Sequence, residues 1–404
     1  MRLVVFLQNR VPPKVRDSYK KDAWTGILGS VMSGLTVPFI AIIAREQLKA
    51  SIFEIGIISA VPTAGSILSL YWAHMMKGRS AMKFAVWPGI ICRTLLLLVF
   101  FTTDSWSFVT IISLFWIIST IPGPAYSVLM KEIYPDSDRV RIMSYVRVCI
   151  VITTIIVAAI AGPVLKVISY RYVFPVAGIF GIISALCFYR ISSSAVITGS
   201  SESFLHMIVD AVRALRQDHA YRWFCGGVFI FGAANLFAIP IYSIYQVDVL
   251  HVDTRWASVY TVIGLVVATG AYFYWGPYVD RKRPAAVSSI CTFLFCIIPI
   301  NYLFATQTWM LIPTCIIGGV ANAGLELAYF NSILHYAPAD KVTLYQGVFA
   351  SLMGIRGISV PFISAALVQG DIISMHTVFI VSMLVMVLGA CAQVYGMHRY
   401  ERQR

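Results

Sequence analysis

Residues 274–283 read Tyr-Trp-Gly-Pro-Tyr-Val-Asp-Arg-Lys-Arg, and the pair that opens this stretch occurs once before, as Tyr71-Trp72. The step from residue 71 to residue 274 is an offset of 203 residues. At the same offset, residues 124–126 (Pro-Ala-Tyr) correspond to residues 327–329 (Leu-Ala-Tyr), and Pro135 corresponds to Pro338. A weak repeat of this length indicates a fold built from two related halves.

The composition places most of the chain in lipid. Of its 404 residues, 59% are hydrophobic and only 12% are charged, and the mean hydropathy is +0.79. A soluble protein of this length could not bury that much apolar surface. The eight cysteines show neither a CxxC motif nor a Cys/His ligand spacing, so they indicate no disulfide framework and no zinc site.

The apolar segments are long enough to cross a bilayer as helices, which takes about 20 residues each. We therefore predict an all-α membrane protein with 12 transmembrane helices in two pseudo-symmetric six-helix bundles. The predicted spans lie near residues 24–44, 53–75, 84–103, 107–130, 144–166, 170–190, 223–246, 256–278, 285–305, 309–335, 343–369 and 373–397.

The formal charge of +13 reflects membrane topology. Basic residues gather in the connections on one side of the predicted spans, including residues 77–83, 131–141, 213–222 and 281–283, and the opposite connections hold few. This asymmetry predicts that the basic side is cytoplasmic and makes nucleic-acid binding a remote alternative. An even number of spans then places both termini in the cytoplasm, and we expect a multi-pass protein of the plasma membrane.

The same pattern predicts the division of the chain. A cytoplasmic N-terminal segment (1–23) precedes an N-terminal six-helix bundle (24–190), and an amphipathic cytoplasmic linker (191–222) leads to a C-terminal six-helix bundle (223–397). The tail, 398–404, is cytoplasmic. Pro38 and Pro240 hold nearly equivalent places in the first helix of each bundle, where we expect each proline to kink its helix.

Residues 276–283 carry a family resemblance. Gly276, Asp280 and Arg281 resemble the loop motif G-x-x-x-D-R/K-x-G-R/K-R/K of the major facilitator superfamily, although Arg283 stands where the motif has a glycine. The first-half copy keeps only Gly78-Arg79, and Lys77 stands at the position of Asp280. The resemblance covers essentially the whole chain and implies a transporter that works by alternating access.

In that family the loop acts as a cytoplasmic gate. We expect Asp280 to contact the start of the fifth helix when the cytoplasmic side is closed, because an aspartate is favoured at a helix N-terminus and beside basic groups. The alternative is an ordinary solvated basic loop. The predicted gate comprises Asp280, Arg281, Gly276, Arg139, Arg141, Arg147, Gly78 and Arg79.

Three ionisable residues lie at mid-membrane depth, where a charge is costly and indicates function. Glu326 shares a helix face with Asn322 and Tyr329, and the resemblance implies that this face lines the cavity; we predict that Glu326 carries protons. Arg356 suits a carboxylate or phosphate on the substrate. The alternative is a structural ion pair between Glu326 and Arg356. Arg93 is expected to be a packing residue.

Further polar residues are predicted to line the substrate pathway, although each could instead be a packing contact. They come from the first, fourth and seventh helices, and they describe an aromatic, amide-lined cavity suited to a small amphipathic organic solute. These residues are Ser33, Thr36, Trp116, Thr120, Tyr126, Asn235, Tyr242 and Gln246.

The sequence therefore predicts a secondary active transporter of a small organic solute. Residues 161–163 (Ala-Gly-Pro) resemble the Gly-Pro of drug/proton antiporters, which slightly favours export, but a packing kink explains them as well. The alternatives are a non-transporting scaffold or assembly factor of the same fold and a membrane-embedded enzyme.

No GxxxxGK[ST], HExxH or GxSxG motif occurs, so we expect no cofactor, no metal and no catalysis. The expected partners are the solute, protons and the lipid bilayer, with the protein a monomer.

Overall fold

The computed structural model describes residues 11–65, 68–76, 78–135, 138–191, 193, 213, 215–216, 218–281, 284–336 and 342–403. Every regular element in this part of the chain is a helix, as the apolar segments predict. Most of the predicted linker, 191–222, lies outside the described residues.

The first half contains η1 (Pro13–Val15), α2 (Arg16–Thr36), η2 (Val37–Phe39), α3 (Ile40–Glu46), α4 (Ile52–Ala64), α5 (Leu68–Met75), α6 (Ala81–Leu98), η3 (Val99–Phe101), α7 (Ser105–Ser119), α8 (Pro122–Ile133), α9 (Arg139–Val167) and α10 (Tyr170–Tyr189). The second half contains α12 (His219–Asp248), α13 (Thr254–Arg281), α14 (Pro284–Phe295), α15 (Ile297–Phe304), η4 (Thr308–Leu311), α16 (Ile312–Tyr336), α17 (Val342–Gln369) and α18 (Met375–Gln403).

The helices agree with the predicted membrane spans. Among the described residues, 11 helices are long and apolar enough to cross a bilayer, and Ile52–Thr63 is a shorter apolar helix at the place of the second predicted span. Large apolar side chains face outward along them, for example Phe273 (81% exposed), Phe101 (74%) and Phe304 (71%). Such side chains are stable against lipid, not against water.

Prolines interrupt some helices and not others. Pro38 lies in the short 3-10 turn η2 that separates α2 from α3, as predicted. Residues 120–121 separate α7 from α8, and Pro122 is the first residue of α8, where its missing N–H leaves no helical hydrogen bond unmade. Pro240, in contrast, lies inside α12, which continues through it without interruption. The equivalence of Pro38 and Pro240 in sequence is therefore not an equivalence in structure.

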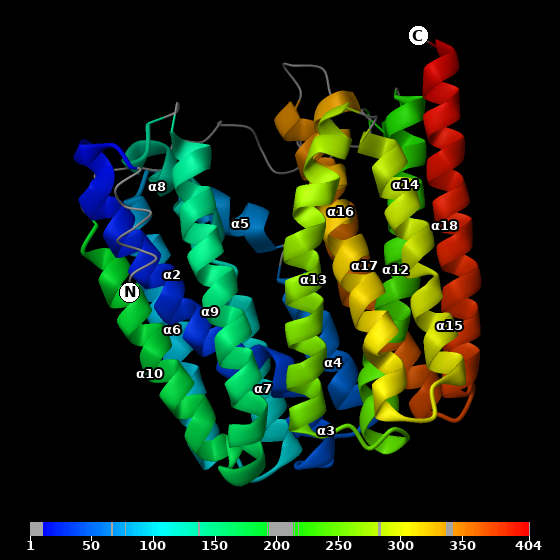
Figure 1. Ribbon diagram of the computed structural model, residues 1–404, viewed down its shortest axis with the longest axis horizontal. Helices are drawn as coiled ribbons and strands as arrows, with labels where there is room; N and C mark the ends of the chain where they lie inside the picture. The colour runs from blue at the N-terminus through cyan, green and yellow to red at the C-terminus, as the bar shows by residue number, and fades with distance from the viewer. Residues whose placement is uncertain are drawn as a thin grey trace. The chain divides into compact units, whose positions relative to one another are not determined.

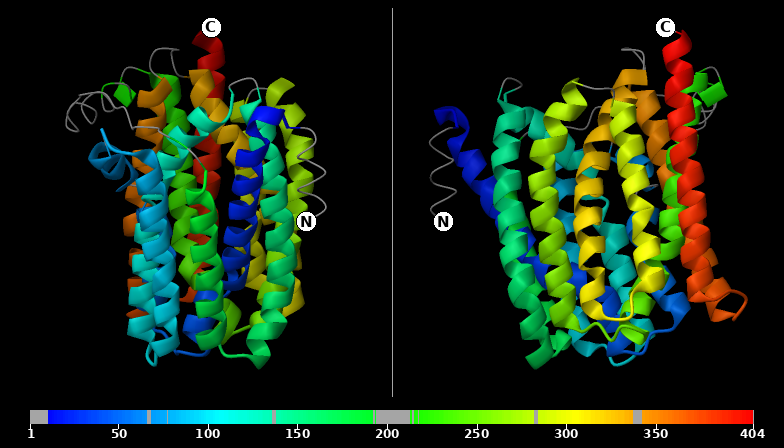
Figure 2. Two further views of the ribbon diagram at one scale, coloured as in Figure 1. Left: turned by 90° about the vertical axis from the view of Figure 1, so that its left-hand side faces the viewer. Right: turned by 45° about the vertical axis from the view of Figure 1, so that its right-hand side comes forward.

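The chain forms two compact units. Unit 1 comprises residues 1–50, 65–200 and 253–259, and unit 2 comprises residues 51–64, 201–252 and 260–404. In unit 1, α2 packs against α9 and α10, and α10 packs against α6 (Figure 1). In unit 2, α12 packs along α18 and against α17, and α14 packs against α16 and α18; α18 is the red helix that ends at the C-terminus in Figure 2.

Each unit has an apolar core. In unit 1 the core includes the fully buried Tyr19 and Tyr134, and the Tyr134 hydroxyl donates a hydrogen bond of 2.9 Å to the buried Asp22 carboxylate. In unit 2 the core surrounds Tyr221, whose hydroxyl donates to the Tyr345 carbonyl at 2.6 Å. Burial of the Tyr134 and Tyr221 hydroxyls is tolerated because each donates a hydrogen bond.

The units differ from the predicted bundles at two repeat-related places. Residues 51–64, which open the second helix of the first half, belong to unit 2; residues 253–259, which open the second helix of the second half, belong to unit 1. Residue 254 follows residue 51 by the repeat offset of 203. Each half therefore gives the start of its second helix to the other unit.

Candidate functional site

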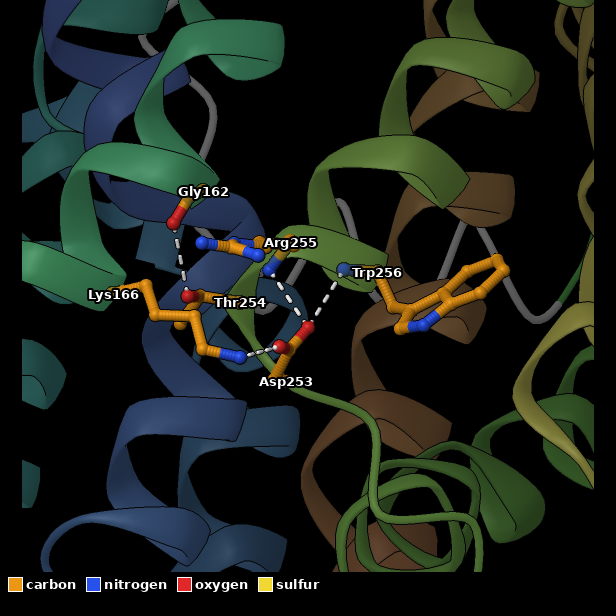
Figure 3. Close-up of polar contacts among 6 residues, drawn as sticks. All are labelled: Gly162, Lys166, Asp253, Thr254, Arg255 and Trp256. Carbon is orange, nitrogen blue, oxygen red and sulfur yellow. Dashed lines mark hydrogen bonds and ion pairs between the residues drawn. The ribbon is translucent and has the colours of Figure 1, made fainter.

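The start of α13 is tied to α9 by polar contacts within unit 1 (Figure 3). Lys166 Nζ lies 2.5 Å from Asp253 Oδ2. The other oxygen of this carboxylate, Oδ1, accepts the backbone N–H groups of Arg255 (3.0 Å) and Trp256 (3.1 Å). Asp253 thus caps the first turn of α13 and pairs with a cation of α9 at the same time.

Burial and hydrogen bonding shift the pKa of the Asp253 carboxyl in opposite directions. Partial burial raises the pKa of Asp253, but the hydrogen bonds from Lys166 and from the backbone N–H groups of Trp256 and Arg255 outweigh it, and the net pKa lies below the ordinary value. Asp253 is therefore ionised at neutral pH and able to hold Lys166.

Two hydroxyl groups in the first turns of α13 also bind backbone carbonyls of α9. Thr254 Oγ1 donates to the Gly162 carbonyl at 3.0 Å, and Ser258 Oγ donates to the Ala158 carbonyl at 2.7 Å. A Cβ at Gly162 would lie 2.0 Å from Ser258 Oγ and 2.3 Å from the Thr254 carbonyl oxygen. Only glycine fits, so the Gly-Pro of residues 162–163 has a packing reason in this structure.

Unit 2 holds the repeat-related contact, between α4 and α17. The backbone N–H of Phe53 donates to Gln369 Oε1 at 2.7 Å, and the rings of Phe53 and Phe362 lie 5.8 Å apart. A Cβ at Gly56 would lie 2.7 Å from Ala365 Cβ. Gln369 follows Lys166 by 203 residues, so the same position carries a cation in one contact and a neutral amide in the other.

We call these two contacts the α9–α13 clasp (Lys166, Asp253, Thr254, Ser258, Gly162) and the α4–α17 clasp (Gln369, Phe53, Gly56, Ala365). Sequence reasoning did not single out Asp253, Lys166 or Gln369. A signal existed: the ends of the fifth and eleventh predicted spans and the starts of the second and eighth are related by the same offset as the tryptophans.

The tryptophans that reveal the repeat also make equivalent contacts. Tyr71 and Trp72 lie edge to face at 5.1 Å, and Tyr274 and Trp275 do so at 5.0 Å. In unit 1, Trp72 Nε1 donates to Thr120 Oγ1 at 3.2 Å, and in unit 2, Trp275 Nε1 donates to the Val320 carbonyl at 3.0 Å. In each half the second helix is thus attached to the fourth by an indole.

The predicted proton carrier lies at the surface of unit 2. Glu326 and Asn322 are exposed residues of α16. The Tyr272 hydroxyl, from α13, donates a hydrogen bond to Glu326 Oε2. The hydrogen bond joins α16 to α13, and the role of Glu326 as a proton carrier stays a prediction.

Arg356 lies elsewhere. Its Nη1 donates to the Val228 carbonyl and, at 3.4 Å, to the Phe229 carbonyl, both in α12. Within the described residues Arg356 forms no ion pair, so the structural pairing of Glu326 with Arg356, given above as an alternative, is not found. Glu326 lies on α16 and Arg356 on the next helix, α17, but their side chains bind different helices: Glu326 binds α13 and Arg356 binds α12.

Tyr329, from the same face as Glu326 by sequence, points into the core of unit 2. Its ring lies 5.5 Å from that of Phe349 and 6.4 Å from that of Phe224. Its hydroxyl is buried and has no hydrogen-bond partner among the described residues.

The predicted polar face of the seventh helix packs inside unit 2. Tyr242 is 9% exposed, and its ring stacks on Tyr302 at 4.2 Å and on Phe379 at 5.4 Å. Gln246 Nε2 donates to the Tyr302 hydroxyl at 2.6 Å, and Asn235 is half-buried. Tyr242 and Gln246 therefore make the packing contacts that were the alternative to a solute-lining role.

The first-half residues are dispersed in unit 1. Ser33 donates to the Gly29 carbonyl and the buried Thr36 to the Met32 carbonyl, both within α2. Trp116 lies edge to face with Phe115 at 5.5 Å. Tyr126 lies 5.7 Å from Phe188, in the core, and Thr120 accepts from Trp72 as described.

The predicted gate residues are only partly described. The side chains of Arg139, Asp280 and Arg281 lie outside the description, so the Asp280 contact stays a prediction. Gly276 is half-buried in α13, and Arg147 is exposed. Arg141 pairs with Asp138 at 2.6 Å.

The first-half loop is better defined. Gly78 adopts a φ of +70°, a conformation that L side chains rarely adopt. Arg79 lies over the Phe84 ring at 6.0 Å and lines a surface pocket of about 510 Å³ with Ser80, Lys83, Phe84, Trp87 and Pro88.

The buried arginine of the third helix behaves as a packing residue. The side-chain carbons of Arg93 lie against Gly181 of α10, where a Cβ would approach its Cδ to 2.9 Å. Its Nε is buried without a partner among the described residues.

The sequence repeat, the apolar spanning helices and the repeat-related α9–α13 and α4–α17 contacts describe a polytopic helical membrane protein built from two related halves. The model of the Major Facilitator Superfamily matches residues 23–298. The chain belongs to this superfamily. No curated protein sequence matches the chain.

Solved structures agree in fold. A bacterial homolog of the human lysosomal transporter Spinster, inward-facing and unoccupied, is similar with a TM-score of 0.71 at 11% identity, over 98% of this chain and 99% of that chain. The nucleoside transporter NupG gives 0.70 at 14% identity, over 94% and 98%. A mutant of the peptide transporter POT in complex with alafosfalin gives 0.71 at 10% identity, over 94% of each chain.

Proposed function

We propose that the protein is a secondary active transporter that moves a small organic solute across the plasma membrane by alternating access. The family supports transport, and the similar solved structures include carriers described for nucleosides and for peptides. Their low identity leaves this chain's solute to be inferred from its own residues.

The pair of clasps carries the proposal. Each clasp joins the start of a second helix to the end of a fifth or eleventh helix through small residues, a few hydrogen bonds and one polar side chain. Such contacts are weak enough to break and remake, because exposed ion pairs contribute only about 0.2–1 kcal/mol. Two clasps related by the repeat are suited to open and close together.

Proton coupling is the proposed energy source, with Glu326 as the proton carrier and export as the favoured direction. The exposed position of Glu326 and its phenol donor Tyr272 support exchange with water. The direction rests only on the Gly-Pro resemblance, which the close approach of Gly162 to Ser258 explains equally well. Asp280, on the side that we assign to the cytoplasm, is the proposed gate residue opposite the clasps.

The test uses proteoliposomes loaded with a defined mixture of anionic, cationic and neutral metabolites. Under an imposed pH gradient, the protein should release at least one solute faster than protein-free liposomes do, as measured by mass spectrometry. Cross-linking the double variant Lys166→Cys/Asp253→Cys should stop this release, and reductant should restore it. Flux that continues unchanged with the cross-link in place would contradict clasp-gated alternating access.

The double variant Lys166→Cys/Arg171→Cys is a control for the cross-linking treatment, since Arg171 lies on α10, outside the clasp. Release with this control should be the same before oxidation, after oxidation and after reduction, because its two cysteines do not bridge the clasp. Failure of every solute in the mixture to leave would contradict transport itself.

A further inference from the structure

Arg356 is a part-buried cation with no ion pair among the described residues. It lies near the middle of α17, within the apolar span Val348–Gln369. Its only described polar partners are two backbone carbonyls of α12. Carbonyl dipoles solvate a guanidinium partly, and a charge held in a membrane protein without an acid is costly. In the described part of unit 2, Arg356 is therefore a positive charge that carbonyl groups, and no acid, compensate.

The orientation of the guanidinium leaves one edge unused. Nη1 is the atom anchored to the Val228 and Phe229 carbonyls. Nε is buried with no partner, and Nη2 donates no hydrogen bond among the described residues. Nε and Nη2 form the parallel pair of N–H groups that binds the two oxygens of a carboxylate or phosphate. The anchored atom fixes the direction in which this pair points.

A glycine of α12 makes room for this arrangement. A Cβ at Gly232 would lie 1.7 Å from Nη1 and 2.3 Å from Nη2 of Arg356. Any side chain at residue 232 would push the guanidinium off the helix. Glycine at residue 232 therefore lets the Arg356 guanidinium lie directly against the backbone of α12.

A second orphan donor accompanies the first. The Tyr329 hydroxyl is buried without a partner in the described part of the chain, and Tyr329 and Arg356 interact electrostatically. The Tyr329 ring packs with Phe349, which precedes Arg356 on α17 by two turns. A buried donor without a partner calls for an explanation, and an empty ligand site is one. Arg356 Nε and the Tyr329 hydroxyl both lack an acceptor among the described residues, and the oxygens of an anion are the acceptors that suit both.

We propose that Arg356 and Tyr329 bind the anionic oxygens, carboxylate or phosphate, of an aromatic or apolar organic acid, and that Phe349 contacts its body. This inference rests on the proposed function and names its substrate class as organic anions. Arg356 and Tyr329 are part-exposed as residues, while Arg356 Nε is covered. Leu352 and Met353, on the turn that precedes Arg356, are only partly buried against the same core and leave apolar surface for the body of the anion.

The alternative is that Arg356 only staples α17 to α12. The two roles predict different ligand binding. If Arg356 only joins the two helices, anions should stabilise the protein no more than neutral molecules do. Arg93 provides the comparison: it is another arginine in an apolar span with an unpartnered Nε, but it packs on α10 in unit 1.

The experiment measures thermal unfolding of the purified full-length protein in detergent with four probes of similar size: benzoate, phenyl phosphate, benzamide and benzylamine. A ligand that binds the native state raises Tm with its concentration. We expect benzoate or phenyl phosphate to raise Tm, and benzamide and benzylamine to leave it unchanged. Arg356→Gln should weaken anion binding by at least about tenfold.

Two further variants keep the test decisive. Arg356→Lys keeps the charge but loses the fork, so its anion affinity should fall below that of the wild type while the protein stays folded. Arg93→Gln should bind the anions as the wild type does. Stabilisation by all four probes alike, by neither anion, or by the anions equally in Arg356→Gln would overturn the proposal.

The outcomes separate this inference from the proposed function. Release of only neutral or cationic solutes from the loaded proteoliposomes, unaffected by Arg356→Gln, would leave the transporter in place and remove the anion site. Anion-dependent stabilisation without flux of any solute would keep the site and remove transport.

Discussion

Lys166 Nζ and Asp253 Oδ2 lie 2.5 Å apart and join the end of α9 to the start of α13, whereas the equivalent of Lys166 in the second repeat, Gln369, accepts a backbone N–H instead. The repeat has therefore kept the geometry of the contact and changed its chemistry. One clasp depends on charge, and the other does not.

Salt should loosen the charged clasp only. In a Thr254→Cys variant, the rate of maleimide labelling reports opening, because residue 254 is buried in the closed contact. We expect labelling to rise with ionic strength, by at most about fivefold, which corresponds to the ~1 kcal/mol upper range of an exposed ion pair. Adding Asp253→Asn should give the fast rate at every salt concentration. The wild-type protein, labelled in parallel, corrects for its native cysteines.

A matched reporter on the neutral clasp is Ile55→Cys, because Ile55 is fully buried on α4 next to Gly56, whereas a cysteine at Gly56 itself would be strained by Ala365. Its labelling should be independent of salt. Equal salt dependence at both clasps would show that the ion pair is not the cause.

The clasp should not respond to pH in the physiological range. The pKa of Asp253 in the folded protein lies below its ordinary value near 3.9, so its stabilising contribution is complete above that value and is lost only as pH falls through the lower, folded pKa. Maleimide reacts with the thiolate, so the labelling rate of Thr254→Cys is divided by that of a free thiol at the same pH, and we expect this ratio to be flat between pH 5 and pH 8. A change in that interval would have to come from another group.

Gly162 should tolerate no side chain. Gly162→Ala places a methyl 2.0 Å from Ser258 Oγ, and overpacking of this kind costs about 1–3 kcal/mol or more. The expected result is a lower thermal stability and fast labelling of Thr254→Cys. Ser258→Ala should rescue only part of the loss, because the Thr254 carbonyl, 2.3 Å from the added methyl, remains. Gly226→Ala is the control, since nothing lies within 4 Å of its added Cβ.

Much of this architecture could be predicted from the sequence. The repeat, the spans and the family motif follow from hydropathy and offset, and the family match confirms the superfamily. The Tyr-Trp pairs even share ring geometry. These features depend on local pattern, which a single sequence displays directly.

The partners of individual side chains could not be predicted. Arg356 and Glu326 lie on consecutive helices, yet Arg356 bonds to carbonyls of α12 and Glu326 accepts from Tyr272. A helix rotation of a few tens of degrees decides between such partners, and apolar helices carry little amphipathic signal to fix it. Tyr242, predicted to line the pathway, stacks in the core for the same reason.

Glu326→Gln should uncouple transport from the proton gradient. Loss of the titratable carboxyl removes the proposed proton carrier, while the amide still accepts a hydrogen bond from Tyr272. We expect gradient-driven accumulation to disappear and solute exchange at equal concentrations to remain. Tyr272→Phe is the comparison: it removes the donor and keeps the carboxyl, so accumulation should persist. Accumulation unchanged in Glu326→Gln would remove this residue from the mechanism.

Replacing Trp72 and Trp275 should destabilise the protein by different amounts, although the two residues occupy equivalent positions in the repeat. Replacing Trp72 or Trp275 by Phe removes one indole hydrogen bond in each unit, worth about 0.5–1.5 kcal/mol. Trp275 is 4% exposed and close to Gly324, so its smaller replacement also leaves a cavity, whereas Trp72 is only half-buried. Thermal unfolding should therefore show a larger loss for Trp275→Phe than for Trp72→Phe. Tyr274→Phe, at a 64% exposed ring, should change Tm little. Equal losses at both tryptophans would mean that the hydrogen bond, not the packing of the ring, sets the stability of this junction.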